Sequence, residues 1–212
     1  MRVFKVVIMG KKKMYVHSPH LRPDDDRDIL STKIELEYNG MYHLKNFYRL
    51  AHDWLADEYY EDADGYSDKC ETCYWDRTKP DGSKENWIWW RTIKIPHENN
   101  YYRFFLRIDM QVLGAKTVEV MHQGHKFKMN KANIKFVIEG WLQLDYQDKW
   151  RKHFILKHFD RIFRKRWFKK QIEDYKWELY KDVYRFERQM KDYLELHSPY
   201  PRPKLFKPNK GF

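Results

Sequence analysis

The segment 149–170, here called the basic segment, combines positive charge with bulky apolar side chains. Ten of its residues are Lys or Arg, and Asp160 is its only acid. Lys and Arg side chains bind phosphates and displace counterions from nucleic acids, and aromatic rings between them stack on unpaired bases. The basic segment therefore predicts a contact surface for a nucleic acid or another polyanion.

Helical spacing divides the basic segment into two sides. At about 100° per residue, the Lys and Arg side chains from 157 to 165 lie opposite an apolar side that contains Ile155 and Phe159. We expect the apolar side to pack on the protein and the basic side to face the partner. The alternative is a solvated helix face without a partner. The predicted nucleic-acid contacts are Trp150, Arg151, Lys157, Arg161, Arg164, Lys165, Trp167 and Lys169.

Cys70 and Cys73 are the two cysteines of the chain, and their spacing is that of half a zinc site. A structural zinc site needs four ligands, and the sequence has no second pair of cysteines. The histidine pairs 17/20 and 122/125 have a similar spacing, but nothing in the sequence brings them to the cysteines. We predict no cofactor and no metal, with Cys70 and Cys73 as the candidates for zinc.

Sequence motifs of common catalytic sites are missing. The chain has no Gly-rich phosphate loop, no G-x-S-x-G and no H-E-x-x-H. The acids between 24 and 28 form a cluster, but the neighbouring prolines and Arg27 favour a solvated linker over a metal site. We therefore predict a protein that is not an enzyme.

The charge is distributed unevenly along the chain. The net charge is +11, from 42 Lys and Arg against 31 Asp and Glu. Residues 1–22 carry six basic side chains and no acid, whereas 41–65 carry six acids against Lys45 and Arg49. Segregated charge of this kind indicates the partners of a protein rather than its fold.

No apolar run approaches the roughly 18 residues of a transmembrane helix, and the apolar run at the start is too short for a signal peptide. A secreted disulfide scaffold is excluded by the close spacing of the two cysteines. These features predict a soluble, cytoplasmic protein.

Alternating apolar residues predict an antiparallel sheet before the basic segment. The strands are expected at 32–38, 85–95, 101–112 and 132–145, with Gly140 as a possible bulge in the last. An amphipathic helix is expected at 41–60. Within WIWW, two tryptophans share one strand face and Ile88 shares the other with Trp90. We favour a core role for these aromatic residues over a base-stacking platform.

The stretch 147–196 has no Pro and no Gly and is predicted to be helical. Its apolar side moves by about half a turn near 166–168. Two helices with a break there, or one long helix that packs different faces, would explain the shift. One long helix would leave an apolar stripe for another subunit.

Several stretches of the sequence resemble a group of small, functionally uncharacterised proteins of archaea. The resemblance covers about residues 32–195, implies a shared α+β domain and carries no activity. The stretches are TKIELEYNG, KPDGSKENWIWW, YYRFFLRIDMQVLG, TVEVMHQGHKFKM and WLQLDYQDKW.

We predict one α+β domain at 32–196, with an N-terminal arm at 1–31 and a proline-rich basic tail at 197–212. The predicted function is non-enzymatic binding of nucleic acid or a ribonucleoprotein surface through 149–170 and the basic tails. One alternative is self-assembly through the arms and the second apolar stripe, giving a homo-oligomer or a larger assembly. Another is a pocket for an apolar ligand, because the order of elements resembles a helix-grip fold.

Overall fold

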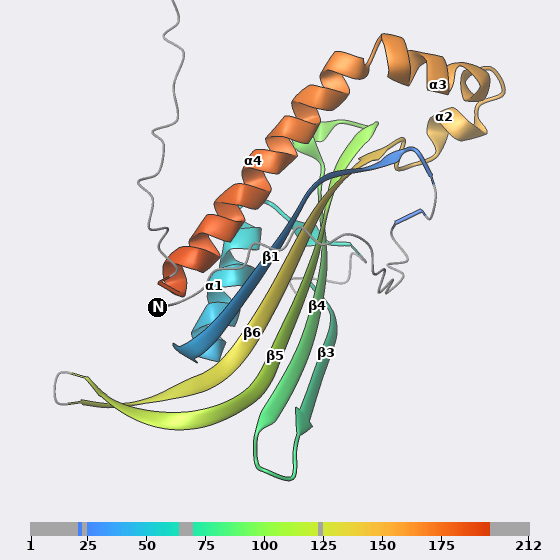
Figure 1. Cartoon of the computed structure of the whole chain (residues 1–212). Coiled ribbons are helices and arrows are strands. Elements are labelled where there is room, and N and C mark those ends of the chain that lie inside the picture. The colour runs from blue at the N-terminus through green and yellow to red at the C-terminus, as the bar shows by residue number, and fades with distance from the viewer. Residues whose placement is uncertain (1–20, 23–24, 64–69, 123–124, 196–212) are drawn as a thin grey trace, which may run out of the picture.

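A computed structural model of the protein describes residues 21–22, 25–63, 70–122 and 125–195 (Figure 1). The predicted C-terminal tail and the N-terminal arm up to residue 20 lie outside these residues. The described chain forms an antiparallel sheet of six strands with helices on one face, which confirms the α+β class. The strands are β1 (Asp28–Tyr42), β2 (Glu61–Asp62), β3 (Glu71–Thr78), β4 (Lys84–Lys94), β5 (Tyr102–His122) and β6 (His125–Leu144).

The strand order is β1-β6-β5-β4-β2, and β3 also pairs with β4. The strands predicted from alternation are present, but the first is longer than expected and begins at Asp28 rather than residue 32. The turn between β3 and β4 is closed by a hydrogen bond from the Lys79 amide to the Ser83 carbonyl at 2.8 Å. Gly82 lies in that turn with a φ of 76°, a conformation that favours glycine.

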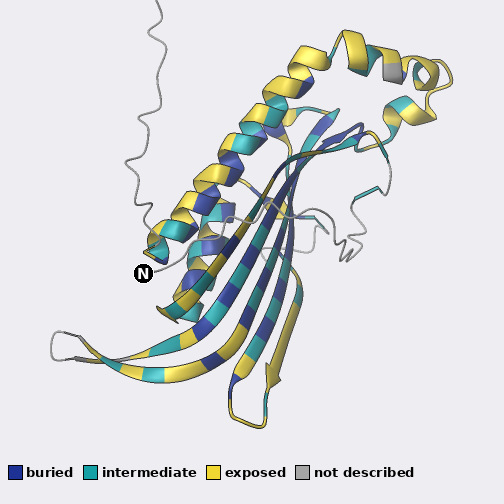
Figure 2. Ribbon diagram, viewed as in Figure 1, coloured by how far each residue is buried: buried dark blue, intermediate teal, exposed yellow. Residues whose placement is uncertain are grey.

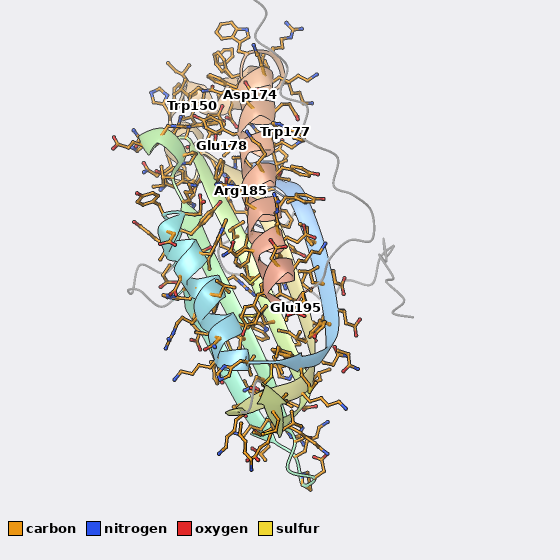
Figure 3. All side chains as sticks on the ribbon, turned by 90° about the vertical axis from the view of Figure 1, so that its left-hand side faces the viewer. Trp150, Asp174, Trp177, Glu178, Arg185 and Glu195 are labelled. Carbon is orange, nitrogen blue, oxygen red and sulfur yellow. The ribbon has the colours of Figure 1, made fainter. Side chains whose placement is uncertain are left out.

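Four α-helices and one 3-10 turn complete the described chain. The predicted break near 166–168 is present, because α3 ends at Arg166 and α4 begins at Lys169. In Figure 3, α1 lies on one side of α4 and β1 on the other. The helices are α1 (Leu44–Asp57), α2 (Lys149–Lys152), α3 (Leu156–Arg166) and α4 (Lys169–Tyr193), and the 3-10 turn is η1 (Pro96–Glu98).

The core lies between the sheet and the pair α1 and α4. Phe47 of α1 packs on Phe136 of β6, with ring centroids 5.7 Å apart, and Trp54 packs on Phe186 of α4 at 4.8 Å. In β4, Ile88 and Trp90 point into this core and are almost fully buried. The core role predicted for these two residues is therefore confirmed. Trp87 and Trp89, on the opposite strand face, stay half-buried.

The long helix α4 lies directly on the sheet at Gly140. A Cβ atom added to Gly140 would lie 2.9 Å from Cγ2 of Val183, so glycine is what allows the close approach. The bulge predicted at Gly140 is on the neighbouring strand instead, where the register of β1 shifts between Leu30 and Thr32. The extra residue, Ser31, donates a hydrogen bond to the Lys176 carbonyl of α4 at 2.8 Å.

Burial of the second apolar stripe corrects one expectation. Leu179, Val183, Phe186 and Met190 of α4 are fully buried on the protein's own sheet, so this stripe is not free to contact another subunit. Side chains of α4 lie close to the sheet at Gly140. The pocket for an apolar ligand stays a prediction.

Candidate functional site

The basic segment extends beyond the end of the sheet as α2, α3 and the start of α4 (Figure 1). Asp145, just after β6, begins this extension. Its carboxylate accepts hydrogen bonds from the backbone amides of Trp150 and Arg151, both at 3.1 Å, and so caps the first turn of α2. Asp148 adopts a left-handed conformation with a φ of 53°, which turns the chain from the strand into α2.

Ion pairs near the start of β1 stabilise the first turn of the basic segment. Arg27 is almost fully buried and donates to Asp148 at 2.6 Å and to Asp25 at 2.5 Å. Its hydrogen bonds and charge lower the pKa of Asp25 to about 2. Arg22 pairs with Asp28 at 2.6 Å. The described part of the predicted solvated linker is therefore an ionic anchor, because buried guanidinium groups need carboxylate partners.

An aromatic cluster joins the basic segment to the sheet. Trp150 contacts Tyr101, Phe163 and Phe168, with ring centroids between 5.2 and 5.9 Å apart. Trp150 is half-buried among these rings, and its predicted contact with a base stays a prediction. Its role is to position α2 and α3 relative to the end of β5.

Arg164 was also predicted to contact the partner, and the structure gives it an internal role. Its guanidinium pairs with Asp160 at 3.0 Å and with Asp26 at 3.1 Å, which leaves the side chain 11% exposed. Asp160 accepts a further hydrogen bond from the Tyr101 hydroxyl at 3.0 Å. Burial and this carboxylate raise the pKa of Tyr101 well above its usual range. Asp160 and Arg164 therefore fasten α3 to the body of the protein.

The other predicted contacts are open to solvent. Lys157, Lys165, Lys169 and Trp167 are exposed, as is Arg151, which lies 3.9 Å from Asp25. The backbone of Arg161 belongs to α3, but its side chain lies outside the described residues. Within the described chain, seven exposed cations of this region form no ion pair, and four of them were not among the predicted contacts. The seven are Lys149, Lys152, Lys157, Lys165, Arg166, Lys169 and Lys170.

The expected burial of the first apolar side is wrong. Ile155, Phe159 and Ile162 are exposed, and Figure 2 shows α3 exposed over most of its length, whereas α4 alternates between buried and exposed residues. The inner side of α3 consists of partly or fully buried residues: Leu156, Asp160, Phe163 and Arg164. An ion pair and one ring thus hold α3, and its apolar stripe stays in solvent.

The remaining candidates form no second site. Cys70 is buried, and Cys73 is half-buried within β3. Among the described residues, no three His, Cys, Asp or Glu side chains are grouped to hold a metal ion. The absence of a cofactor stays a prediction.

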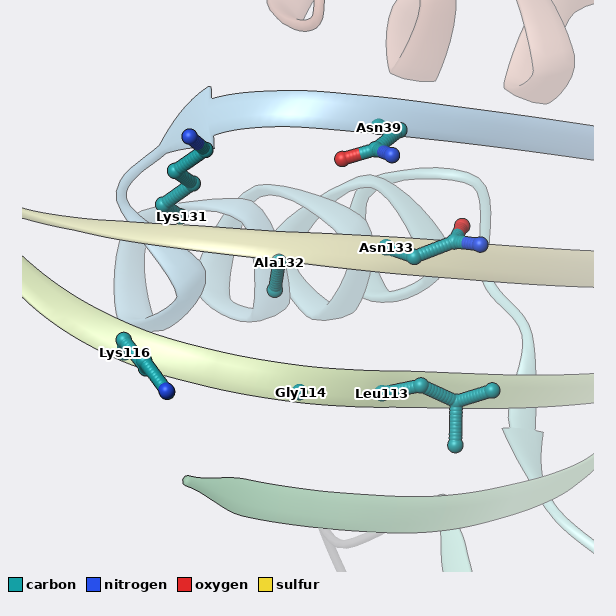
Figure 4. A pocket seen from close by; sticks show the side chains of 7 residues that line it. All are labelled: Asn39, Leu113, Gly114, Lys116, Lys131, Ala132 and Asn133. Atoms are coloured by element: carbon teal, nitrogen blue, oxygen red, sulfur yellow. The ribbon is translucent and has the colours of Figure 1, made fainter. Parts of the chain in front are cut away.

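A hollow of about 330 Å³ lies on the sheet between β1, β6 and β5 (Figure 4). Lys116 and Lys131 lie opposite each other in register at this hollow. Lys116 is 3.5 Å from Asp81, so part of the positive charge is neutralised there. The hollow is therefore a weaker site for anions than the basic segment.

No protein-family model matches the chain, and no curated protein matches it. The resemblance to uncharacterised archaeal proteins stays a prediction. Among the described helices, none combines the length and the apolar composition that crossing a membrane requires.

Proposed function

We propose that this protein is a non-enzymatic binding protein that docks on a polyanion through its basic segment. The observation that supports the proposal is the set of seven exposed cations that no described carboxylate neutralises. Unpaired, solvated Lys and Arg side chains are free to bind phosphates and to release counterions. The acidic residues nearby are used to anchor Arg22, Arg27 and Arg164 instead.

A nucleic acid or a ribonucleoprotein surface is the polyanion that the sequence predicts. The cations are spread over α2, α3 and the start of α4 rather than gathered in a groove. Such a surface supports contacts to a phosphate backbone and lacks the paired donors that read individual bases. We therefore expect binding with little dependence on nucleotide sequence.

The experiment is a fluorescence anisotropy titration of the full chain with labelled single-stranded RNA over a series of salt concentrations. The test variant is K157Q/K165Q/K169Q, and the matched control is K126Q/K128Q/K131Q, which removes the same charge from exposed positions of β6. The parent should lose affinity steeply as salt increases. The test variant should lower the slope of log affinity against log salt by about 2, since each contact contributes about 0.7 on single strands.

The control variant should keep most of the slope of the parent. Equal losses in the test and control variants would mean that net charge alone drives binding. Absence of RNA binding at low salt would remove nucleic acid as the partner, and a salt-independent affinity would contradict phosphate contacts altogether.

A further inference from the structure

The basic segment exposes large apolar side chains beside its free cations. Five of them have exposed fractions between 47% and 79%: Phe154, Ile155, Phe159, Ile162 and Trp167. Contiguous exposed apolar groups of this size mark a contact surface. Phosphate contacts explain the lysines of this region, but they give no role to Ile155 and Ile162, because an aliphatic side chain neither binds phosphate nor stacks as a ring does.

These apolar side chains form one stripe on α3. Ile155, Phe159 and Ile162 are spaced by four and three residues and so lie on the same face. Phe154 and Trp167 lie just outside the two ends of the helix. The inner face, with Asp160 and Arg164, is a different side, so the stripe points away from the body.

Cations lie beside this stripe and on the opposite side of the helix. Lys165 lies on α3 next to Ile162, Arg166 follows Phe159 and Ile162 on the helix surface, and Lys157 lies on the opposite side. Near the start of the helix, Lys157 lies over the ring of Phe154, with its Nζ atom 5.6 Å from the ring centroid. A helix with an apolar face bordered by Lys and Arg has the composition that binds at a bilayer interface.

We infer that the same surface also binds an anionic lipid bilayer, on which α3 lies parallel to the membrane plane. This inference rests on the proposed function and adds a second polyanion for the same site. The stripe of Ile155, Phe159 and Ile162 enters the boundary between headgroups and acyl chains, and the lysines bind the lipid phosphates. With eleven residues, α3 is about 16 Å long, so it lies on a bilayer of about 30 Å and does not cross it.

A second copy of the chain fits the stripe less well. Docking stripe against stripe would bring together two segments that each carry ten basic residues and one acid. Like charges at close range oppose such a contact. An anionic bilayer satisfies both features of the surface, because it accepts the apolar side chains and neutralises the cations.

The experiment is vesicle flotation of the full chain, using phosphatidylcholine vesicles with and without phosphatidylglycerol. The stripe variant is I155S/F159S/I162S, and its control is M41S/Y59S/M121S, which replaces three exposed apolar side chains elsewhere. The parent should float with anionic vesicles and remain in the bottom fraction with neutral vesicles. The stripe variant should partition at least about tenfold more weakly, and the control variant should float like the parent.

RNA binding by the same proteins separates this inference from the proposed function. The stripe variant should bind RNA as strongly or as weakly as the parent does. In the flotation assay, K157Q/K165Q/K169Q should no longer float with anionic vesicles. A parent that binds RNA but no vesicles would overturn the inference and leave the proposed function intact. A parent that binds neither would overturn both.

Two further results would overturn the inference alone. One is equal flotation of the stripe variant and the parent. The other is a dimer of the parent in light scattering that the stripe variant dissociates, which would make a second copy the occupant of the stripe. Circular dichroism of each variant confirms that the fold is retained.

Discussion

Two consecutive helices, α3 and α4, have apolar residues at similar spacing, but only the apolar side of α4 is buried. In α4, Phe186 and its neighbours in the stripe are fully buried on the sheet. In α3, Phe159 lies in a stripe of equal spacing and is 47% exposed. An amphipathic pattern therefore predicts a helix with an apolar face, and it does not reveal whether the protein itself covers that face.

The reason for the difference is the place of each helix relative to the sheet. The sheet has one covered face, and α1 and α4 occupy it, as their contacts at Phe136 and Gly140 show. The break at Trp167 and Phe168 turns α3 past the end of the strands (Figure 1). Beyond that end, α3 touches the body through its ion pair and the ring of Phe163, and none of the described residues covers the stripe.

The largest expected effect comes from removing one ring from each helix. Phe186→Ala should lower the free energy of unfolding by about 3–5 kcal/mol, because it leaves a cavity in a closed core. Phe159→Ala should change it by less than about 0.5 kcal/mol, because the ring is already solvated. Urea unfolding of both variants measures the two effects. Similar losses would mean that α3 packs on the body as α4 does.

The close approach of α4 to the sheet predicts a smaller effect at Gly140. Gly140→Ala should destabilise by about 1–3 kcal/mol, because its Cβ atom would crowd Cγ2 of Val183. Adding Val183→Ala removes the crowded methyl group, so the double variant should be more stable than the sum of the single effects predicts. A double-mutant cycle from urea unfolding tests this, and strictly additive effects would place α4 farther from β6.

The ionic anchor of α2 predicts the smallest effect, which depends on pH. The pKa of Asp25 is about 2 when it is paired with Arg27, below its ordinary value of 3.8. A lowered pKa stabilises the fold above the ordinary value, and this stabilisation is lost as the pH falls from about 4 to about 2.

Asp25→Asn should therefore cost on the order of 1 kcal/mol at pH 6 and less at pH 3. Urea unfolding of the parent and the variant at both pH values measures this difference. A difference that stays constant between the two pH values would show that the charge of Asp25 contributes nothing to the anchor.

Much of the body could be predicted from the sequence, because local patterns determined it. Alternation in β5, the turn before β4 and the helix at α1 follow from residue order alone. The bulge at Ser31 could not be predicted, since it depends on how α4 meets β1 across 145 residues. Gly140 was recognised in the sequence as a special position of its strand, but it allows close contact with α4 and does not form a bulge.

At the candidate site, the sequence predicted a basic surface, but it did not show which side chains the fold encloses. Arg164 is paired with Asp26 and Asp160, and Trp150 packs on Tyr101, whereas Lys157 is exposed. Partners such as Asp26 and Tyr101 lie far away in the sequence and leave no local signal. The structure also exposes Lys149, Lys152, Arg166 and Lys170, which were not among the predicted contacts.

The residue order alone determined the α+β class, the shift of the apolar side near 167 and the concentration of positive charge in 149–170, because each depends on neighbours along the chain. The tertiary structure decided which charges stay free and which apolar stripe stays uncovered. Both depend on the limited area of one sheet face, which α4 occupies and α3 does not reach. Burial requires a second surface to pack against, and the spacing of apolar residues along the chain does not specify which of two similar helix sides meets that surface.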